Sequence, residues 1–502
     1  MPQDMSFFAR LRRIHAALPI VLATASAAAC TGRPEATAIE RLQPCSADEG
    51  PTDAYCGTLS VYENRETRQG RRIGLKIVVL PALGTGAAAD PLFFLAGGPG
   101  QGAAQMARAV RELFRGVHRL RDIVLVDQRG TGGSNPLNCR HDSNSLAALA
   151  EPEEASLARL KKCLEGYDAD VRHYTTSIAM DDLDDVRAHL GYEQINLYGG
   201  SYGTRAALVY LRRHEERVRS VVLDGVAPPG MRLPLFAARD AQLALDRLLA
   251  DCDADPACRA AHPDLSGRVR ALVARLEENP ARVRLTHPRT GVAEDVTIEA
   301  RAVAAFLFGS LYNPLTASLV PTLLARAEQN DFQGLLALAF AAEGLEENMS
   351  LGMQLSVLCA EDVPHVAAED VEREGAGSVF GTHLMSSRLN ACAIWPRGNV
   401  DPSFYEPITS DKPVLVLSGE VDPVTPPSWG DAVLPHLKNA RHIIMPSTGH
   451  GVVATPCGNR IIRDFIDNAS FEELDTSCVG SVRRPPFFLT PAGPDPALST
   501  AK

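Results

Sequence analysis

The stretch Ile195-Asn-Leu-Tyr-Gly-Gly-Ser-Tyr-Gly-Thr-Arg-Ala-Ala-Leu-Val-Tyr210 predicts a strand, a tight turn and a helix in succession. Its first four residues suit a short buried strand, and Ala206 to Leu211 continue as a helix. Between them lies Gly199-x-Ser201-x-Gly203, the spacing of a nucleophile elbow, in which a strained turn lifts a serine hydroxyl clear of the backbone. A Gly-rich turn with an incidental serine is the alternative. The strand before the turn and the helix after it favour Ser201 as a nucleophile.

Further buried-strand patterns lie on both sides of this stretch, and helical patterns separate most of them. They cover Cys56–Tyr62, Arg72–Leu80, Leu92–Leu95, Ile123–Val126, Val218–Leu223, Val414–Leu417 and His442–Met445. Short apolar strands that alternate with helices predict an α/β protein with a mostly parallel, doubly wound sheet. The alternation stops between about Met231 and Tyr405, where the pattern is mostly helical, so we expect an inserted helical cap.

These patterns divide the 502 residues into parts. Residues 51–230 form the first part of the core, 231–405 the cap, and 406–481 the second part of the core. A polar linker over residues 30–50 precedes them. The Pro-rich tail over 482–502 is expected on the surface, with its last residues disordered.

The N-terminus has the features of a targeting segment. Arginines at positions 10, 12 and 13 precede a mostly apolar run over Ile14–Ala29, which is too short to span a bilayer comfortably and ends in small residues. We therefore expect residues 1–29 to be a signal peptide. Cys30, directly after the small residues, resembles the lipidation site of a bacterial lipoprotein, although Ala27 stands where such signals usually have leucine. Simple secretion is the competing interpretation, so the protein is expected to be periplasmic, secreted or anchored to a membrane through Cys30.

The cysteine count agrees with export. Of 11 cysteines, removing Cys30 leaves 11 − 1 = 10, an even number that favours disulfides in an exported chain. Pairing neighbours along the sequence gives Cys45–Cys56, Cys139–Cys163, Cys252–Cys258, Cys359–Cys392 and Cys457–Cys478. No Cys-x-x-Cys pair or His/Cys cluster has metal-ligand spacing, so we expect no metal. The net charge of −11 and the lack of a basic stripe argue against a nucleic-acid partner.

A serine hydroxyl needs a base to take its proton, and the base needs an acid to orient it. On such a sheet the chain order is serine, acid, histidine. Asp422 follows a buried strand at the sheet edge where ligands bind, and His450 follows the next strand. We therefore predict the catalytic triad Ser201, Asp422 and His450. Glu420 is a less favoured acid because it lies closer to the strand end, and His442 begins a strand.

Two backbone N–H groups must stabilise the oxyanion of the tetrahedral intermediate. One is expected from Tyr202, the residue after the nucleophile, and the other from the loop Ala96–Gly100. Gly98 is the candidate there, because Pro99 has no N–H and glycine lets the backbone approach a substrate. Thr425, three residues past the acid, either hydrogen-bonds Asp422 or is a simple turn residue.

Several motifs together resemble the prolyl aminopeptidase and tripeptidyl aminopeptidase family of serine peptidases, which have the α/β-hydrolase fold. They are Gly97-Gly-Pro-Gly100, Asp127-Gln-Arg-Gly-Thr-Gly-Gly-Ser134, Gly199-Gly-Ser-Tyr-Gly203 and Gly449-His450. The resemblance runs from about Cys56 to Cys478. Cys359, Trp395-Pro396 and Gly419-Glu-Val-Asp-Pro-Val-Thr425 are similar to the secreted, disulfide-bearing tripeptidyl branch. The shorter prolyl enzymes usually have His where this chain has Ala96, which puts strict proline specificity in doubt.

The resemblance implies removal of residues from a free peptide N-terminus, without a cofactor. An aminopeptidase must hold the α-ammonium of its substrate, and a carboxylate does this best. Glu361, then Asp362, are the candidates, because they lie in the cap beside Cys359. The alternative is a pair of solvated surface acids.

Two other functions are compatible with parts of this pattern. A carboxylesterase or lipase would use the same triad, with an apolar groove in place of an acidic pocket. The other is a catalytically inactive binding protein on a hydrolase scaffold, and the complete triad argues against it. A hydrolase with an aspartate nucleophile is disfavoured because the elbow carries Ser201.

Overall fold

The computed structural model describes residues 41–139, 145–146, 149, 151–343, 349–490 and 493–494. The chain divides into a short unit, Met1–Ala36, and a large unit, Thr37–Lys502, and everything below concerns the second. The expected signal peptide over 1–29 and the candidate lipidation site Cys30 lie outside the described residues. Within the described residues, no helix is long and apolar enough to span a bilayer.

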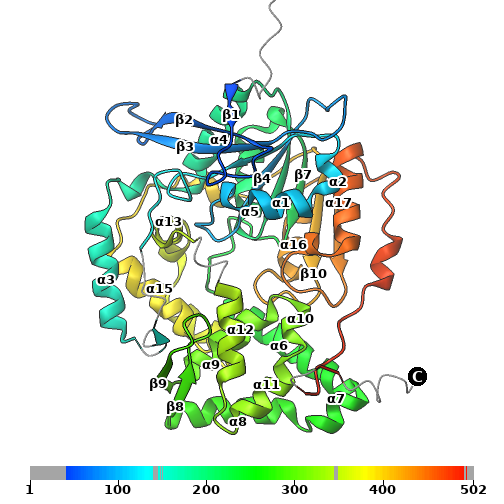
Figure 1. Cartoon of the computed structure of the whole chain (residues 1–502). Coiled ribbons are helices and arrows are strands. Elements are labelled where there is room, and N and C mark those ends of the chain that lie inside the picture. The colour runs from blue at the N-terminus through cyan, green and yellow to red at the C-terminus, as the bar shows by residue number, and fades with distance from the viewer. Residues whose placement is uncertain are drawn as a thin grey trace, which may run out of the picture. The chain divides into compact units, whose positions relative to one another are not determined.

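A large sheet runs through the molecule (Figure 1). Within the described residues it has nine strands in the order β1-β2-β3-β5-β4-β6-β7-β10-β11. The pairs from β1 to β5 along this order are antiparallel, and those from β5 to β11 are parallel. The strands are β1 (Gln43–Pro44), β2 (Tyr55–Tyr62), β3 (Arg72–Leu80), β4 (Leu92–Leu95), β5 (Ile123–Val126), β6 (Ile195–Gly200), β7 (Val218–Asp224), β10 (Val414–Gly419) and β11 (Ala440–Met445).

Helices cover both faces of this sheet because its central strands are apolar on both sides. Alternate residues of one strand enter different cores: Phe93 joins the core with α4 (Thr176–Leu190) and α5 (Tyr202–Arg213), whereas Phe94 joins the core on the other face. That second core contains α1 (Ala107–Leu113), α2 (Arg115–His118) and α17 (Pro456–Asn468). The predicted α/β class with a doubly wound sheet is confirmed.

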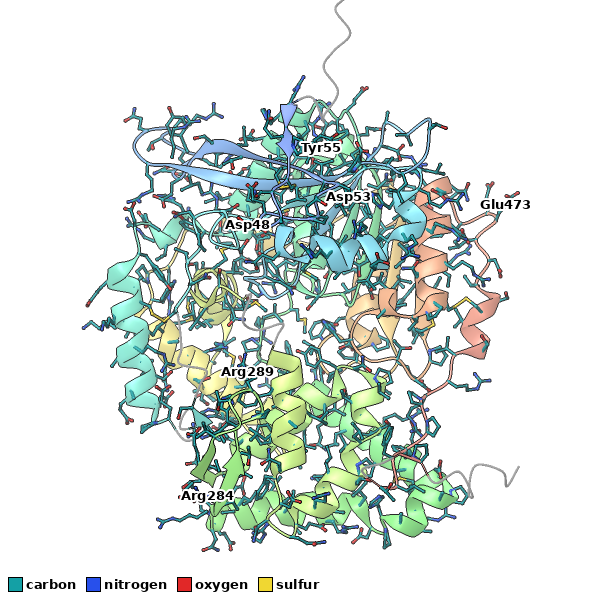
Figure 2. The ribbon with its side chains drawn as sticks, in the orientation of Figure 1. Asp48, Asp53, Tyr55, Arg284, Arg289 and Glu473 are labelled. Carbon is teal, nitrogen blue, oxygen red and sulfur yellow. A yellow bond between two sulfur atoms is a disulfide. The ribbon has the colours of Figure 1, made fainter. Side chains whose placement is uncertain are left out.

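The chain between β7 and β10 forms a mainly helical region with a core of its own. It also contains an antiparallel hairpin, β8 (Ala281–Thr286) and β9 (Ala293–Ile298), which the sequence analysis did not predict. Figure 2 shows Arg284 of β8 at the surface of this hairpin. The helices are α6 (Ala237–Ala254), α7 (Pro256–Ala261), α8 (Leu265–Glu278), α9 (Ala300–Leu311), α10 (Pro314–Ala317), α11 (Val320–Ala327), α12 (Gln333–Glu343), α13 (Leu351–Val357), α14 (Ala368–Gly375) and α15 (His383–Ile394).

A second segment joins this region from an earlier part of the chain. Helix α3 (Glu153–Gly166) lies in sequence between β5 and α4, but it packs beside α15 of the cap (Figure 1). The disulfide Cys139–Cys163 holds its C-terminal half. Residues assigned in the sequence analysis to the first part of the core therefore contribute a helix to the cap side of the molecule.

The structure contains the five disulfides that pairing of sequence neighbours gives. Cys45–Cys56 ties the expected linker to β2, and β1 lies within that linker, so its last residues are structured. The Pro-rich tail also differs from the surface position expected for it. Phe487 is 3% exposed in the cap core, and Phe488 N donates to Ser318 O at 3.1 Å.

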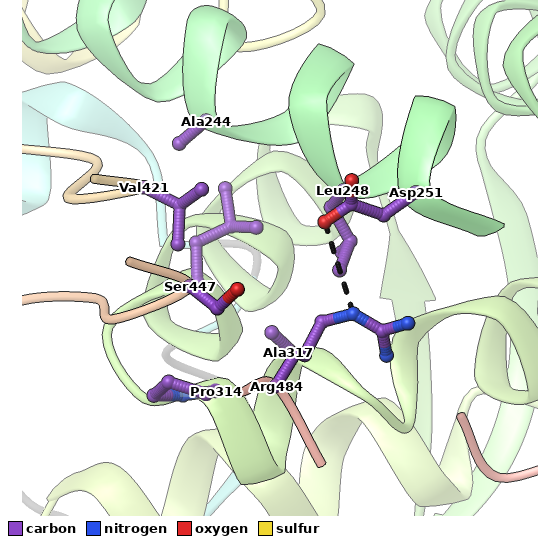
Figure 3. A pocket seen from close by; sticks show the side chains of 9 residues that line it. Ala244, Leu248, Asp251, Pro314, Ala317, Val421, Ser447 and Arg484 are labelled. Atoms are coloured by element: carbon purple, nitrogen blue, oxygen red, sulfur yellow. Dashed lines mark ion pairs between the residues drawn. The ribbon is translucent and has the colours of Figure 1, made fainter. Parts of the chain in front are cut away.

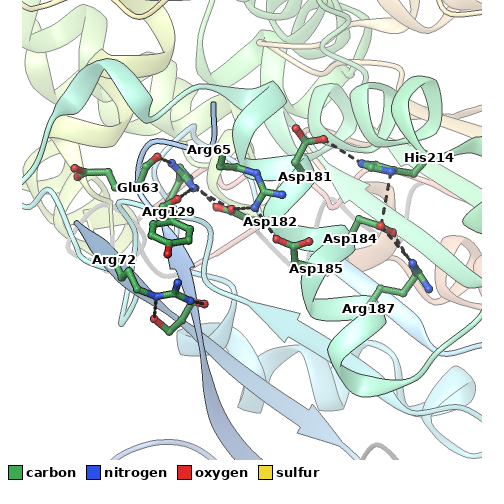
Figure 4. Close-up of polar contacts among 12 residues, drawn as sticks. Glu63, Arg65, Arg72, Arg129, Asp181, Asp182, Asp184, Asp185, Arg187 and His214 are labelled. Carbon is green, nitrogen blue, oxygen red and sulfur yellow. Dashed lines mark hydrogen bonds and ion pairs between the residues drawn. The ribbon is translucent and has the colours of Figure 1, made fainter. Parts of the chain in front are cut away.

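A buried ionic network holds α4 against the loop after β5 (Figure 4). Arg129, fully buried, donates through Nε and Nη2 to the two carboxylate oxygens of Asp182, at 2.6 and 2.9 Å. Its Nη1 also donates to the carbonyls of Glu63 and His173. Arg65 donates to Asp182 from the surface side, at 2.8 Å. The motif Asp127–Ser134 thus places an arginine whose donors are satisfied only when α4 is in position.

Asp182→Asn should destabilise the fold by about 3–5 kcal/mol, because it leaves the buried Arg129 guanidinium without its counter-charge. Asp185→Asn is the matched control: it removes an ion pair to Arg65 from a side chain that is 48% exposed, and should change stability by less than about 1 kcal/mol. Urea unfolding measures both. Equal effects of the two substitutions would show that the Arg129 pair does not hold α4.

Candidate active site

Ser201 lies at the turn between β6 and α5, as the elbow pattern predicts. Its φ of 56° is in the left-handed region, a strained position for a residue with a side chain. The flanking glycines permit this turn: a Cβ on Gly199 would lie 2.3 Å from Gly203 O, and one on Gly203 would lie 2.2 Å from Leu95 O. Glycine is therefore obligatory at both positions.

The predicted acid and base meet at the C-terminal ends of β10 and β11. His450 Nδ1 and Asp422 Oδ2 are 2.8 Å apart. Asp422 also accepts hydrogen bonds from the N–H groups of Val424 and Thr425, both at 2.9 Å, and from Thr425 Oγ1 at 2.8 Å. Thr425 Oγ1 is 3.1 Å from His450 Nδ1. Thr425 thus contacts both members of the pair, which favours the hydrogen-bonding role over a simple turn residue.

Burial and charge act in opposite directions on this pair. Burial alone would lower the pKa of His450, but the carboxylate of Asp422 outweighs it and raises the pKa above 6.5. Burial alone would raise the pKa of Asp422, but the charge of His450 and the hydrogen bonds it receives hold this pKa below its ordinary value. The pair is therefore suited to an ionised acid that orients and stabilises a histidine able to take up a proton.

Asp224, the last residue of β7, connects the serine turn to the histidine loop. Its main-chain oxygen accepts the N–H of Ser201 at 2.9 Å. Its carboxylate oxygens accept the N–H groups of Val452 and Val453, both at 2.8 Å and just past His450. Tyr198 Oη donates to the same carboxylate at 2.8 Å. All three side-chain partners are donors, so the geometry fits the ionised form of Asp224.

Gly225 packs closely against the acid–base pair. It has a φ of 73°, and a Cβ there would lie 2.8 Å from Thr425 Oγ1, 3.2 Å from His450 Cε1 and 3.5 Å from Asp422 Oδ2. Any other residue would displace the pair. Asp224 and Gly225 were not predicted as site residues, although the buried-strand pattern Val218–Leu223 is followed directly by this Asp-Gly pair.

The backbone around Ser201 provides unpaired donors. Among the described residues, the N–H groups of Gly98 and Tyr202 donate to no protein acceptor, and the Ser201 hydroxyl makes no hydrogen bond. Tyr202 is the first residue of α5, so its N–H cannot bond within the helix. Gly98 has a φ of 112° and packs against Met349 of the cap, whose sulfur would lie 2.9 Å from a Cβ at this position. Both N–H groups can therefore donate to an oxyanion.

Glu361 and Asp362 are not solvated, and they do not face the candidate nucleophile as free acids. Both are buried, and Asp362 makes two hydrogen bonds to the Arg205 guanidinium, at 2.9 and 3.0 Å. Glu361 accepts Thr176 N at 2.6 Å and Thr176 Oγ1 at 2.8 Å, and lies 3.5 Å from Arg205. The alternative of a pair of solvated surface acids is therefore wrong, and both acids are paired with the chain's own Arg205. Their role in holding a substrate ammonium stays a prediction.

The two rejected alternatives have structural partners. Glu420 accepts Ser447 N at 2.9 Å and forms an ion pair with Arg247. His442 bonds Asp431 at 2.9 Å and Ser418 at 2.9 Å. Among the interactions of the described residues, neither side chain forms a hydrogen bond with Ser201. Among the described residues, no group of three or more His, Cys, Asp or Glu side chains could hold a metal ion.

A small apolar pocket lies behind the loop of the acid (Figure 3). Val421 and Ser447 line it from the loops after β10 and β11, and cap residues line the opposite side. The tail residue Arg484 also lines it and lies 3.8 Å from Asp251 of α6. The tail thus contacts the cap next to the loop that carries Asp422.

The fold is that of the α/β hydrolases: residues 90–294 match the family model described as alpha/beta hydrolase fold. Residues 377–478 match the model described as TAP-like protein. The chain is 26% identical to serine protease Hip1 of Mycobacterium tuberculosis, over 80% of this chain and 82% of that protein. It is 25% identical to tripeptidyl aminopeptidase of Streptomyces coelicolor (87% and 85%) and 29% identical to carboxylesterase B of Mycobacterium tuberculosis (74% and 76%).

The chain is therefore a hydrolase similar to serine peptidases of the tripeptidyl aminopeptidase kind. The predicted fold, the family resemblance and the assignment as an enzyme are confirmed.

The decrease of kcat/KM at low pH should follow the protonation of His450. A protonated imidazole cannot take a proton from Ser201, so kcat/KM should fall as the pH drops through a midpoint above 6.5. Asp422→Asn removes the charge that raises this pKa. The midpoint should then move to lower pH, and kcat should fall about 10⁴-fold. Steady-state kinetics from pH 5 to 9 tests this, and an unmoved midpoint in Asp422→Asn would contradict the assignment.

Asp224→Asn should lower kcat by about 10²-fold with little change in KM, because an amide NH₂ would face one of the N–H groups that position the His450 loop. Tyr198→Phe is the control: it removes one donor to the same carboxylate and keeps both backbone bonds, so kcat should change only a few fold. Kinetics and circular dichroism on both variants give the comparison. If the substitution changes KM and leaves kcat unaltered, Asp224 does not position His450.

Proposed function

We propose that this protein is an exported serine aminopeptidase that cleaves residues or short peptides from free peptide N-termini. The Asp422–His450 pair at 2.8 Å, formed by loops that both lie next to Gly225 beside the Ser201 turn, is the observation that carries the serine-hydrolase chemistry of this proposal. The named activities of the Hip1 and tripeptidyl aminopeptidase relatives support the peptidase assignment. The five disulfides support export.

In the proposed mechanism, neutral His450 takes the Ser201 proton as Oγ attacks the scissile carbonyl. Asp422 holds the imidazole in the required tautomer and stabilises the imidazolium that forms. The N–H groups of Gly98 and Tyr202 donate to the oxyanion, and the N-terminal end of α5 adds a favourable dipole. His450 then returns the proton to the leaving amine, and water releases the acyl group through the same base.

A carboxylesterase is the second candidate, because the relative named carboxylesterase B is as similar as the peptidases. The two activities share a triad and an oxyanion site, so these parts favour neither. They differ in what the enzyme must recognise: an aminopeptidase requires the free ammonium of its substrate, and an esterase does not.

Three chromogenic substrates separate the two activities. They are a tripeptide nitroanilide with a free amine, the same peptide N-acetylated, and a short-chain nitrophenyl ester. We expect hydrolysis of the free-amine peptide, a large loss on acetylation, and loss of all activity in Ser201→Ala.

Ester hydrolysis with both peptides inert would replace the aminopeptidase by an esterase. Activity that survives in Ser201→Ala would overturn both candidates. Labelling of the native enzyme by a fluorophosphonate, absent in Ser201→Ala, provides an independent check that Ser201 is the nucleophile.

A further inference from the structure

Three aromatic rings form a row that begins at His450 and continues across the cap. The Tyr312 ring stands edge-on to the His450 ring, with the centroids 5.2 Å apart. Phe308 stands edge-on to Tyr312 at 5.6 Å, and Phe380 stands edge-on to Phe308 at 6.1 Å. We call Tyr312, Phe308 and Phe380 the aromatic strip.

The strip is fixed to the catalytic loop by the backbone as well as by the rings. His450 N donates to Tyr312 O at 2.9 Å, and a Cβ on Gly449 would lie 2.4 Å from that oxygen. The main chain at Tyr312 is therefore tied to the main chain of the His450 loop. Phe308 and Tyr312 are four residues apart at the end of α9, so they share one face of that helix.

That face of α9 is less deeply buried than the face that packs into the cap core. Phe306 and Leu307 are buried in the cap core, whereas Phe308, Tyr312 and Phe380 are each half-buried. In the described part of the chain, only Phe380 of the strip packs against that core. Half-buried aromatic rings next to a catalytic histidine are suited to contact with a ligand.

The position beside His450 identifies which part of a substrate would meet the strip. In acyl transfer the base returns its proton to the leaving group, so the leaving atom lies within hydrogen-bond reach of the imidazole. The oxyanion donors Gly98 and Tyr202 act on the carbonyl oxygen instead. A group attached to the leaving atom therefore lies near His450, whose ring Tyr312 contacts edge-on.

We propose that the aromatic strip is a specificity subsite for the leaving-group side of the scissile bond and accepts apolar or aromatic groups there. This inference rests on the proposed function for its substrate. In a peptide, the group bound by the strip is the side chain of the residue directly after the scissile bond, which becomes the N-terminal residue of the released product. The edge-on rings and the half-buried position of Phe308 favour an aromatic or branched apolar side chain.

The test uses peptides that share one acyl part and differ only in the residue after the scissile bond: Phe, Leu, Ala or Asp. Mass spectrometry gives kcat/KM for each. The native enzyme should prefer Phe and Leu to Ala by about tenfold or more. Phe308→Ala should remove this preference mainly through KM and leave the Ala peptide unchanged. Phe308→Leu should retain part of it.

Leu315→Ala is the matched control, because Leu315 is 54% exposed on the same part of the cap and lies outside the strip. It should change no preference. Two results would overturn the inference: a preference that persists in Phe308→Ala, or a Phe308→Ala effect that follows the acyl residue rather than the leaving residue.

Failure of the proposed function would be visible separately. If the native enzyme hydrolyses none of the peptides, esters of one acid with benzyl or methyl alcohol replace them. A benzyl preference lost in Phe308→Ala would then support the strip for an esterase. An absent preference, or one unchanged by the substitution, would reject the strip whichever bond is cleaved.

Discussion

The site depends on one buried carboxylate. Asp224 holds the Ser201 turn through its main-chain oxygen and the His450 loop through its side chain. Two segments that are far apart in sequence are therefore positioned by the same residue. A buried carboxylate without partners would be strongly unfavourable, and here three donors compensate the loss of water. Because a network of this kind is stable only when complete, it selects one arrangement of the loops.

A second buried network connects the candidate nucleophile's surroundings to the cap. Arg205, one helical turn past Ser201, is paired with Asp362 and lies 3.5 Å from Glu361. Burial, opposed by the Arg205 charge, raises the pKa of Glu361 to about 7. Glu361 also accepts the Thr176 hydroxyl, which bonds Tyr202 Oη at 2.6 Å. The residue after Ser201 is therefore linked to the cap by a continuous chain of hydrogen bonds.

Sequence patterns predicted the parts of this structure that short-range chemistry determines. The elbow, the buried strands and the order of serine, acid and histidine can each be read from local spacing. Glu361 and Asp362 could not be interpreted in this way: adjacent acids beside a cysteine look the same whether they face a substrate or an arginine, and Arg205 is 156 residues away from Glu361. The hairpin β8–β9 was missed because it is short and lies among helices. The burial of Phe487 was not predicted, because it depends on contacts with the cap core and the Pro-rich segment around it gives no local sign of them.

The two ends of the candidate site contact the cap in different ways. Met349 packs against Gly98 on the oxyanion side, and Tyr312 packs against His450 on the other side. The reacting groups themselves are held by the sheet, through Asp224 and Gly225. A change in cap side chains away from the Tyr312 main chain can therefore alter which substrates fit without displacing the acid–base pair. This separation is compatible with the similarity of the chain both to proteins named as peptidases and to one named as an esterase.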